Sequence, residues 1–283
     1  MISEILIFTN GNATTFPAVT YGAWLGALLQ TSVRLVGLDE DPSPSRIDEE
    51  THPLEAVFAR AVEAFKQAGT EYALEVVQGQ AENAIPAYVQ GKETLALMGP
   101  LGRPPLKRLL AGRSFRHIME HVAAPILYVP QARLPLKRVL VCLGGLGYEE
   151  TARSLGTRIM LAARAEATLL TVVPPIDLDY PEARQVGENW QSLLDTDTMI
   201  GKNLRRSLEV ARAAGLTASI KIRNGSVVEE IQAEVKEGNY DLLCMGSPRS
   251  SNALRQLYTP NVTAEIAEMD LAPLLTARYA RPE

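Results

Sequence analysis

The sequence predicts an α/β protein made of two tandem domains, each a parallel β-sheet flanked by helices. The first observation behind this prediction is an internal repeat, because four short segments of the first half recur in order in the second half. The second observation is that short apolar runs alternate with longer stretches of helical spacing in both halves. Near-continuous apolar strands separated by helices are typical of a parallel sheet covered on both faces.

The repeated segments keep nearly constant separations of 134, 146, 147 and 148 residues, so only one early stretch of the second half is longer. The pairs are ILIFTNG (5–11) with VLVCLGG (139–145), VVQGQAENAI (76–85) with KIRNGSVVEEI (221–231), TLALMGPLG (94–102) with DLLCMGSPR (241–249), and APILYVP (124–130) with APLLTAR (272–278). We therefore expect homologous domains at 1–132 and 136–283, joined near QARLPLK, where proline and polar residues interrupt the periodicity. The alternative is one large α/β domain with chance similarities.

Each half supplies the elements of a five-stranded sheet. In the first half, strands are expected at 5–8, 33–38, 72–77, 95–98 and 126–129. Helical spacing marks 17–29, 53–68, 81–89 and 114–122, and Gly69 is placed to end the second of these helices. In the second half, strands are expected at 140–142, 168–173, 219–222, 242–245 and 274–275. Ligands of such sheets bind beyond the carboxyl ends of the strands, where the strand order reverses.

Composition and charge narrow the class of protein. The 46% of hydrophobic and 22% of charged residues are ordinary for a soluble globular chain. A net charge of −5 argues against a broad nucleic-acid-binding surface. No apolar run reaches the roughly 18 residues of a membrane helix, and the first residues lack the basic start of a signal peptide. Cys142 and Cys244 lie within apolar runs, which indicates buried thiols and a cytoplasmic location.

A glycine-containing loop follows the fourth strand of the first half, in MGPLGRPPLKRLLAGRS (98–114). Glycine lets backbone N–H groups approach a ligand closely, and Gly112 precedes a helix whose first N–H groups favour an anion. Residues 103–138 contain eight Lys or Arg and one acid, whereas residues 249–281 contain four Arg and three acids. The first half therefore offers an anion-binding loop, and the alternative is a solvated basic surface.

These features resemble the universal stress protein family. The glycines at 99, 102 and 112 form the pattern Gly-x2-Gly-x9-Gly, and LKRLLAG (106–112) is similar to the family sequence between the second and third glycines. The resemblance covers nearly the whole chain, once in each half, so the chain looks like a tandem member. It implies a Rossmann-like parallel sheet of order 3-2-1-4-5 in each domain, and ATP binding where the motif is kept.

The resemblance assigns an adenine-nucleotide site to the first domain. Asn10 stands where nucleotide-binding members have an aspartate, and an amide offers no carboxylate to Mg²⁺, so support for that ion is weak. Leu38 matches the apolar position whose backbone meets adenine. The phosphates are expected on Gly99, Gly102 and Gly112, and on the N–H groups of Arg113 and Ser114. Since the family places Ser or Thr directly after the third glycine, Arg113 either binds phosphate or fills its pocket.

The second domain departs further from the family pattern. Gly246 is kept, but Arg249 and Thr259 replace the other two glycines and Pro260 follows. Gly144 stands where the aspartate is expected. We therefore expect no nucleotide at this position of the second domain.

Three other motifs are interpreted as structural. HIMEH (117–121) fits an inverted zinc-peptidase pattern, but we read it as part of the last helix of the first domain, with no metal. LGGLG (143–147) lacks the flanking residues of a pyrophosphatase loop and indicates a tight turn. The acidic segment 39–50 is expected to be a mobile surface connection, without the spacing of a calcium loop.

The sequence thus leaves two main hypotheses for function. The first is a stress-response protein, catalysis absent or incidental, that binds ATP or another adenine nucleotide in its first domain only. The second is a nucleotide-free scaffold or regulator that acts through protein contacts. A slow ATP hydrolase ranks third, because no evident general base or metal carboxylate stands beside the loop. Tandem members resemble a fused dimer, in which the final strands of the two halves, at 126–129 and near Leu274, are the contact edges. We also expect a homo-oligomer and unknown protein partners. We expect neither a nucleic acid nor a membrane as a partner.

Overall fold

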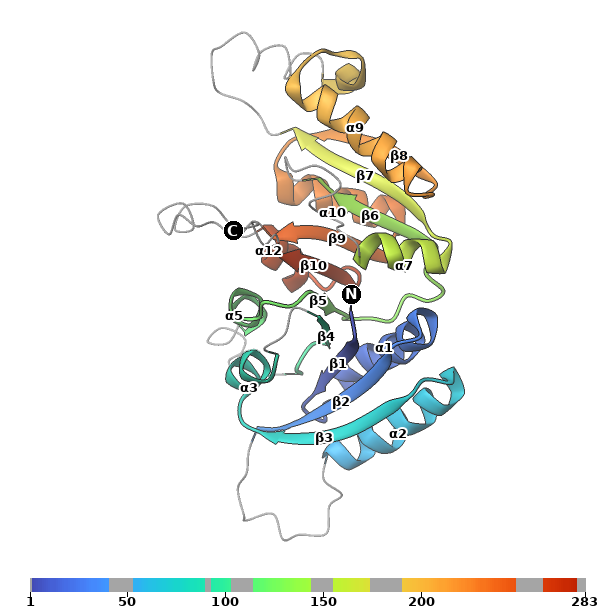
Figure 1. The fold of residues 1–283 in the computed structure, drawn as a ribbon. Helices are drawn as coiled ribbons and strands as arrows, with labels where there is room; N and C mark the ends of the chain where they lie inside the picture. The colour runs from blue at the N-terminus through green and yellow to red at the C-terminus, as the bar shows by residue number, and fades with distance from the viewer. Residues whose placement is uncertain are drawn as a thin grey trace. The chain divides into compact units, whose positions relative to one another are not determined.

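The computed structural model describes residues 2–40, 53–89, 93–102, 114–143, 155–173, 190–247 and 262–278. The chain divides into two compact units, Met1–Ala132 and Arg133–Glu283 (Figure 1). Among the described residues, no helix combines the length and apolar character needed to cross a bilayer.

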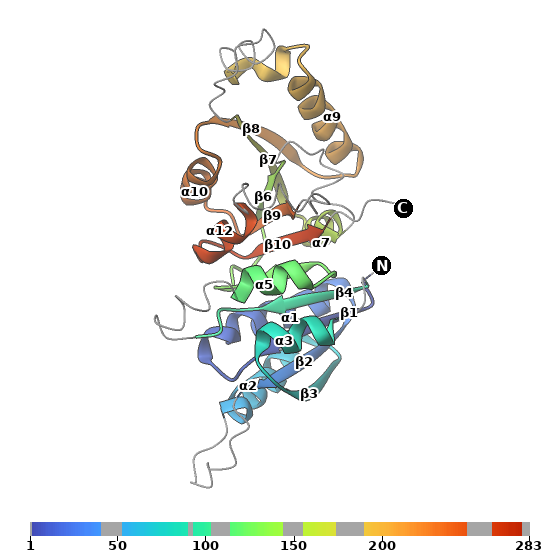
Figure 2. The same cartoon turned by 90° about the vertical axis from the view of Figure 1, so that its left-hand side faces the viewer.

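The first unit contains five parallel strands and the helices that connect them. Its elements are β1 (Glu4–Thr9), η1 (Ala13–Thr15), α1 (Phe16–Leu29), β2 (Ser32–Asp39), α2 (Pro53–Ala68), β3 (Tyr72–Gln78), α3 (Ala81–Tyr88), β4 (Thr94–Met98), α5 (Ser114–His121) and β5 (Ile126–Tyr128). The strands run in the order β3-β2-β1-β4-β5. Helices α1 and α2 cover one face of the sheet, and α3 and α5 cover the other (Figure 2).

The second unit repeats this arrangement. Its elements are β6 (Arg138–Cys142), α7 (Leu155–Ala163), β7 (Glu166–Val173), η2 (Trp190–Asp195), α9 (Met199–Ala213), β8 (Ala218–Asn224), α10 (Val227–Gly238), β9 (Leu242–Ser247), α12 (Val262–Glu268) and β10 (Leu274–Arg278). The order β8-β7-β6-β9-β10 is again 3-2-1-4-5 when the strands are counted along the unit. The expected α/β fold class is therefore confirmed, and every expected strand is present, most of them one or two residues longer.

The helix end expected at Gly69 is also present. Gly69 has φ +69°, its N–H donates to the carbonyl of Lys66, and the N–H of Thr70 donates to the carbonyl of Phe65. A Cβ atom at Gly69 would meet no neighbour within 4 Å, so the backbone conformation alone favours glycine here.

The segment that enters the second unit is fixed by hydrogen bonds within that unit. The Arg133 guanidinium donates to the carbonyls of Tyr240 at 2.7 Å and Leu271 at 2.8 Å. The N–H groups of Lys137 and Arg138 both donate to one carboxylate oxygen of Asp241, at 2.8 and 2.9 Å. Residues 133–137 therefore belong structurally to the second unit, and the Leu134–Pro135 bond among them is cis.

Candidate functional site

The candidate site lies at the carboxyl edge of the first unit, where the strand order reverses. Strand β1 lies between β2 and β4, and Phe8 of β1 is in register with Met98 of β4. Because both strands end at the same edge, the segments that follow them meet there. Open parallel sheets bind ligands at this position.

Asn10 joins the ends of three strands. Its Nδ2 donates to the carbonyl of Leu101, after β4, and to a carboxylate oxygen of Glu40, after β2, both at 3.0 Å. Its Oδ1 accepts from the N–H of Asn12 at 3.2 Å. The side chain therefore bridges β2, β1 and β4 along the edge, which is the path expected for a nucleotide.

Glu40 brings a carboxylate to this edge. One of its oxygens accepts from the N–H of Ala81, the first residue of α3, at 3.0 Å, and its main-chain carbonyl accepts from the Gln80 side chain at 2.7 Å. A carboxylate at a helix N-terminus is favoured by the helix dipole. The sequence had placed Glu40 in a mobile acidic connection; the structure instead fixes it between Asn10 and α3, and residues 41–52 lie outside the described part.

Gly99 and Gly102 lie against the segment that follows β1. A Cβ on Gly99 would stand 2.9 Å from the carbonyl oxygen of Thr14, and one on Gly102 would stand 2.1 Å from the Asn12 side chain. Gly102 also has φ +63°, a conformation that favours glycine. The Thr14 hydroxyl donates to the carbonyl of Pro100 at 2.6 Å. Close packing against backbone thus favours glycine at position 99, and the backbone conformation favours glycine at position 102.

A pair of buried hydroxyl groups supports the segment that follows β1. Thr9 and Thr15 are buried, their Oγ1 atoms are 2.5 Å apart, and the N–H of Gly11 donates to Thr9 at 3.2 Å. Side-chain hydrogen bonds therefore tie the residues between β1 and α1 to the end of β1.

The other expected site residues are placed as follows. The Leu38 side chain is buried with 2% exposure near the end of β2, two residues before Glu40. Ser114 is the first residue of α5. Gly112 and Arg113 lie outside the described residues. The structure therefore brings Asn10 together with the 99–102 segment, while ligand contacts by all of these residues stay predictions.

The corresponding edge of the second unit is described only in part. The carbonyl of Gly246 in β9 accepts from the hydroxyl of Thr263 in α12 at 3.3 Å. Gly144, Arg249, Thr259 and Pro260 lie outside the described residues, so the degenerate loop there stays a prediction.

The two cysteines lie on neighbouring strands but do not face each other. Cys244 of β9 is in register with Val141, and Cys142 of β6 is in register with Met245. Adjacent residues of a strand point to opposite faces, so the two thiols leave opposite faces of the sheet. Both are free and buried, and burial raises the pKa of each to about 12. This confirms the expectation of buried thiols.

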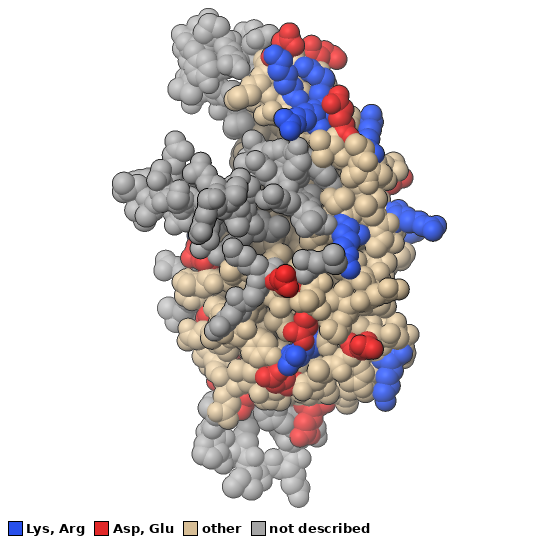
Figure 3. All heavy atoms as spheres, in the orientation of Figure 1, with Lys and Arg blue, Asp and Glu red and all other residues tan. Residues whose placement is uncertain are grey.

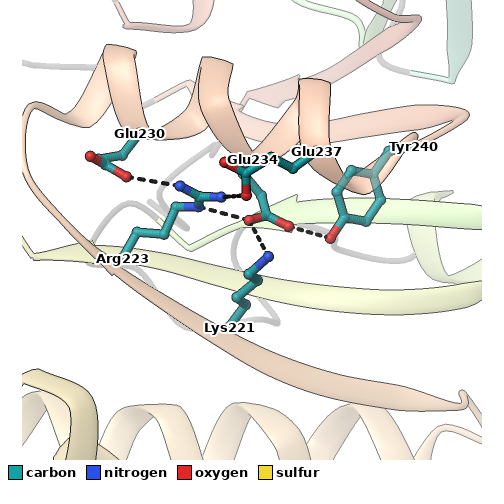
Figure 4. Close-up of polar contacts among 6 residues, drawn as sticks. All are labelled: Lys221, Arg223, Glu230, Glu234, Glu237 and Tyr240. Atoms are coloured by element: carbon teal, nitrogen blue, oxygen red, sulfur yellow. Dashed lines mark hydrogen bonds and ion pairs between the residues drawn. The ribbon is translucent and has the colours of Figure 1, made fainter.

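A cluster of charged side chains in the second unit, missed by the sequence analysis, lies between β8 and α10 (Figure 4). Glu234 is fully buried, and one of its oxygens accepts from Lys221 at 2.6 Å and from Arg223 at 2.7 Å. Its other oxygen accepts from the hydroxyl of Tyr240 at 2.7 Å. Arg223 also pairs with Glu230 at 3.1 Å and with Glu237. The signal was present in the acids at 230, 234 and 237, which share one helix face opposite a strand with cations at 221 and 223.

The cluster shifts the protonation of its members. Burial opposes the charge on Glu234, but the hydrogen bonds from Lys221, Tyr240 and Arg223 outweigh it and lower the pKa of that carboxyl. Burial and the bond to Glu234 raise the pKa of Tyr240 to about 12. Every charged group here has a partner within the cluster, so the arrangement fits the anchoring of α10 on β8.

Other basic side chains of the second unit lie on α9, where blue atoms gather in Figure 3. Lys202, Arg206 and Arg212 of this helix are exposed, while the Arg205 guanidinium donates to the carbonyls of Leu194 and Thr196. These cations are spread along one helix, and the Arg212 guanidinium donates to the carbonyl of Ala218 at 3.2 Å.

Comparison with family models finds a match within the second unit. The model of the universal stress protein family matches residues 135–268. No curated protein matches the sequence.

Solved structures resemble nearly the whole chain. A universal stress protein from Archaeoglobus fulgidus has a TM-score of 0.65 at 15% identity, with 99% of this chain and 97% of that chain covered. A protein from Pseudomonas aeruginosa PAO1 described as functionally unknown has a TM-score of 0.65 at 14% identity, with coverages of 98% and 92%. At such identities the likeness shows the fold.

Proposed function

The chain carries a universal stress protein domain at residues 135–268, and from this premise we propose that it is a tandem member whose first unit alone binds an adenine nucleotide. The base lies beside the end of β2 at Leu38, the ribose lies at Asn10, and the phosphates lie on the 99–102 segment and the start of α5. We further propose a cytoplasmic location, where the two buried thiols stay reduced.

The observation that carries this proposal is the bridge made by Asn10. A single amide, 3.0 Å from both Glu40 and Leu101, connects the ends of β2, β1 and β4 at the point where strand order reverses. The base, sugar and phosphates of a nucleotide follow the same three strand ends. The bridge thus fixes the spacing of the three subsites before the ligand binds.

The phosphate end is supported by backbone and charge. The peptide N–H groups at the start of α5 have no partner within the helix and favour an anion. Arg103, Lys107, Arg108 and Arg113 precede that helix in the sequence with no acid among them. These cations contribute a field that favours a polyphosphate.

Glu40 supplies the carboxylate that Asn10 lacks. Each carboxylate oxygen has two lone pairs, so an oxygen that accepts one N–H can also accept a ribose hydroxyl. Glu40, at the end of β2, therefore provides the carboxylate that faces the nucleotide, which in the family is provided by the aspartate at the position of Asn10. A ribose is bound there in preference to a deoxyribose.

Two experiments test the proposal. Mass spectrometry of small molecules extracted from the purified protein should show an adenine nucleotide, and calorimetry should show one ATP site per chain. Arg113→Glu should weaken ATP binding about tenfold or more, because a like charge now faces the phosphates. Lys202→Glu, the same charge reversal on exposed α9, is the matched control and should leave ATP affinity unchanged. Equal affinities for wild type and Arg113→Glu would rule out this site.

A second candidate function is a nucleotide-free scaffold, and one specific observation favours it. The Asn12 amide lies so close to Gly102 that a Cβ would come within 2.1 Å of it, so the segment after β1 occupies the space beside this glycine. Under this alternative the extract contains no nucleotide, calorimetry with ATP shows no heat of binding, and partners are found by crosslinking.

A further inference from the structure

Helix α5 carries two histidines one turn apart at its carboxyl end. His117 is half-buried, and His121, the last residue of the helix, is exposed. Their rings stack with centroids 4.0 Å apart and planes inclined by 26°. Residues four apart lie on one face of a helix, so the two imidazoles project together.

The hydrogen bonding of His121 sets its tautomer. Its Nδ1 lies 2.7 Å from the main-chain oxygen of His117. Because a carbonyl oxygen can only accept, Nδ1 carries the proton, and the neutral ring keeps its lone pair on Nε2. Metal-binding histidines show the same arrangement, with one nitrogen bonded to a carbonyl and the other free to coordinate.

Packing on the other side of α5 presents the pair to solvent. Ile118 and Met119 are buried, and the ring of Phe115 lies 4.7 Å from that of Tyr128 in β5. Figure 2 shows α5 beside α3 on one face of the first unit. The helix is thus held by its apolar face, and the histidines lie at its end.

We propose that His117 and His121 form a binding site for a borderline transition-metal ion such as Cu²⁺, Ni²⁺ or Zn²⁺. Imidazole nitrogen is a preferred ligand for these ions. Two histidines at this spacing on one helix face bind zinc in metalloproteases. The carboxyl end of a helix favours a cation, and the exposed Glu120 adds a negative charge nearby.

Because imidazole lone pairs lie in the ring planes, the stacked rings chelate one ion once the His117 ring rotates about its side-chain torsions. The site is then a two-histidine chelate completed by water. Within the described parts of the chain, no group of three or more His, Cys, Asp or Glu side chains is placed to hold a metal. Two protein ligands leave coordination positions for water, so the proposed ion exchanges with solvent. Coordination links the last two turns of α5, so metal binding stabilises that end of the helix.

Calorimetry with Ni²⁺ tests the site. The protein carries no affinity tag, is stripped with a chelator and is titrated with Ni²⁺ alone. His121→Ala and His117→Ala should each weaken Ni²⁺ binding at least about tenfold, because the second imidazole adds to affinity only when both are present on one helix. His52→Ala removes the third and last histidine of the chain and should leave the affinity unchanged.

Hydrogen exchange separates metal binding from a change in folding. Ni²⁺ should slow exchange of the amides of α5 in wild type and not in either variant, while exchange without metal stays alike in all three. Ni²⁺ affinity within about twofold of wild type in His121→Ala or His117→Ala, or no heat of binding in wild type, would overturn the proposal. Loss of binding in His52→Ala would assign the metal elsewhere and overturn it as well.

Discussion

In the first unit, polar side chains gather at the carboxyl edge of the sheet, where Asn10 bonds Glu40 and Thr14 bonds the carbonyl of Pro100. In the second unit, a cluster of charged side chains lies between the edge strand β8 and α10, where Lys221 and Arg223 pair with the buried Glu234. The strand order is the same in both. Equal frameworks thus leave the position of the polar groups to the sequence.

One pair of equivalent positions carries polar groups of different chemistry in the two units. Glu75 of β3 accepts from Tyr88 of α3 at 2.6 Å, and Lys221 of β8 pairs with Glu234 of α10, also at 2.6 Å. The partners are 13 residues apart in each unit. Each unit therefore places a polar pair between the third strand and the following helix, but the pair is carboxylate and phenol in the first unit and ammonium and carboxylate in the second.

The largest expected effect comes from removing the charge on Glu234. Glu234→Gln removes the buried anion that Lys221 and Arg223 share. Lys221 is 44% exposed and Arg223 keeps Glu230 and Glu237, so we expect the second unit to lose about 2 kcal/mol of stability, less than for a fully buried pair. Hydrogen exchange monitored by mass spectrometry in denaturant reports each unit separately. Glu237→Gln, the exposed partner of Arg223, is the matched control and should cost much less. A loss below about 1 kcal/mol for Glu234→Gln would contradict the assigned role of the cluster.

The second largest expected effect is a difference in stability between the two units at high pH. The pKa values of Tyr240, Cys142 and Cys244 are each raised to about 12, mainly by burial, so the folded state favours their neutral forms. Stability from these groups is complete below their ordinary pKa values and is lost as the pH rises towards 12. The first unit has the raised pKa of Tyr88, about 12, and no cysteine.

The measurement is denaturant unfolding of each unit at pH 7 and at about pH 10.5, between the ordinary and raised pKa values. The second unit should lose more stability than the first, and Cys244→Ala should reduce that loss. Equal losses in the two units would show that the thiols do not contribute.

The proposed ribose contact gives a smaller effect, confined to the first unit. Wild type should bind ATP roughly tenfold more tightly than 2′-deoxy-ATP, because Glu40 accepts from the 2′-hydroxyl. Glu40→Gln should remove most of this preference while ATP binding persists. Failure of both nucleotides to bind would reject the nucleotide site itself, whereas equal binding of both to wild type would reject only the role of Glu40.

Local patterns predicted the framework well, for a physical reason. Runs such as 95–98 and 242–245 must be buried on both faces, so their apolar composition marks them in the sequence. The end of α2 at Gly69 was predictable because a left-handed residue there favours glycine.

The side-chain contacts were not predictable from local patterns. Glu40 and Asn10 are 30 residues apart, and only the pairing of β1 with β2 brings them together. Gly102 was expected to approach a phosphate, and in the structure it approaches Asn12. The spacing of glycines indicates that another group approaches the backbone closely, but it does not indicate whether that group belongs to a ligand or to the protein.

The smallest expected effect tests Glu75, the carboxylate of the equivalent pair in the first unit. The hydrogen bonds from Tyr88 and Arg34 lower the pKa of Glu75, so its contribution to stability is present above its ordinary pKa of 4.5 and is lost as the pH falls below that. The Glu75 and Arg34 side chains are 40% and 37% exposed, so solvent screens the pair and Glu75→Gln should cost less than about 1 kcal/mol at pH 7. Denaturant unfolding of the first unit at pH 7 and at about pH 3.5 should show a slightly weaker acid dependence in Glu75→Gln than in Glu71→Gln, its exposed control. A cost as large as that of Glu234→Gln would mean that burial is not what separates the two pairs, because their position in the fold and their bond lengths are the same.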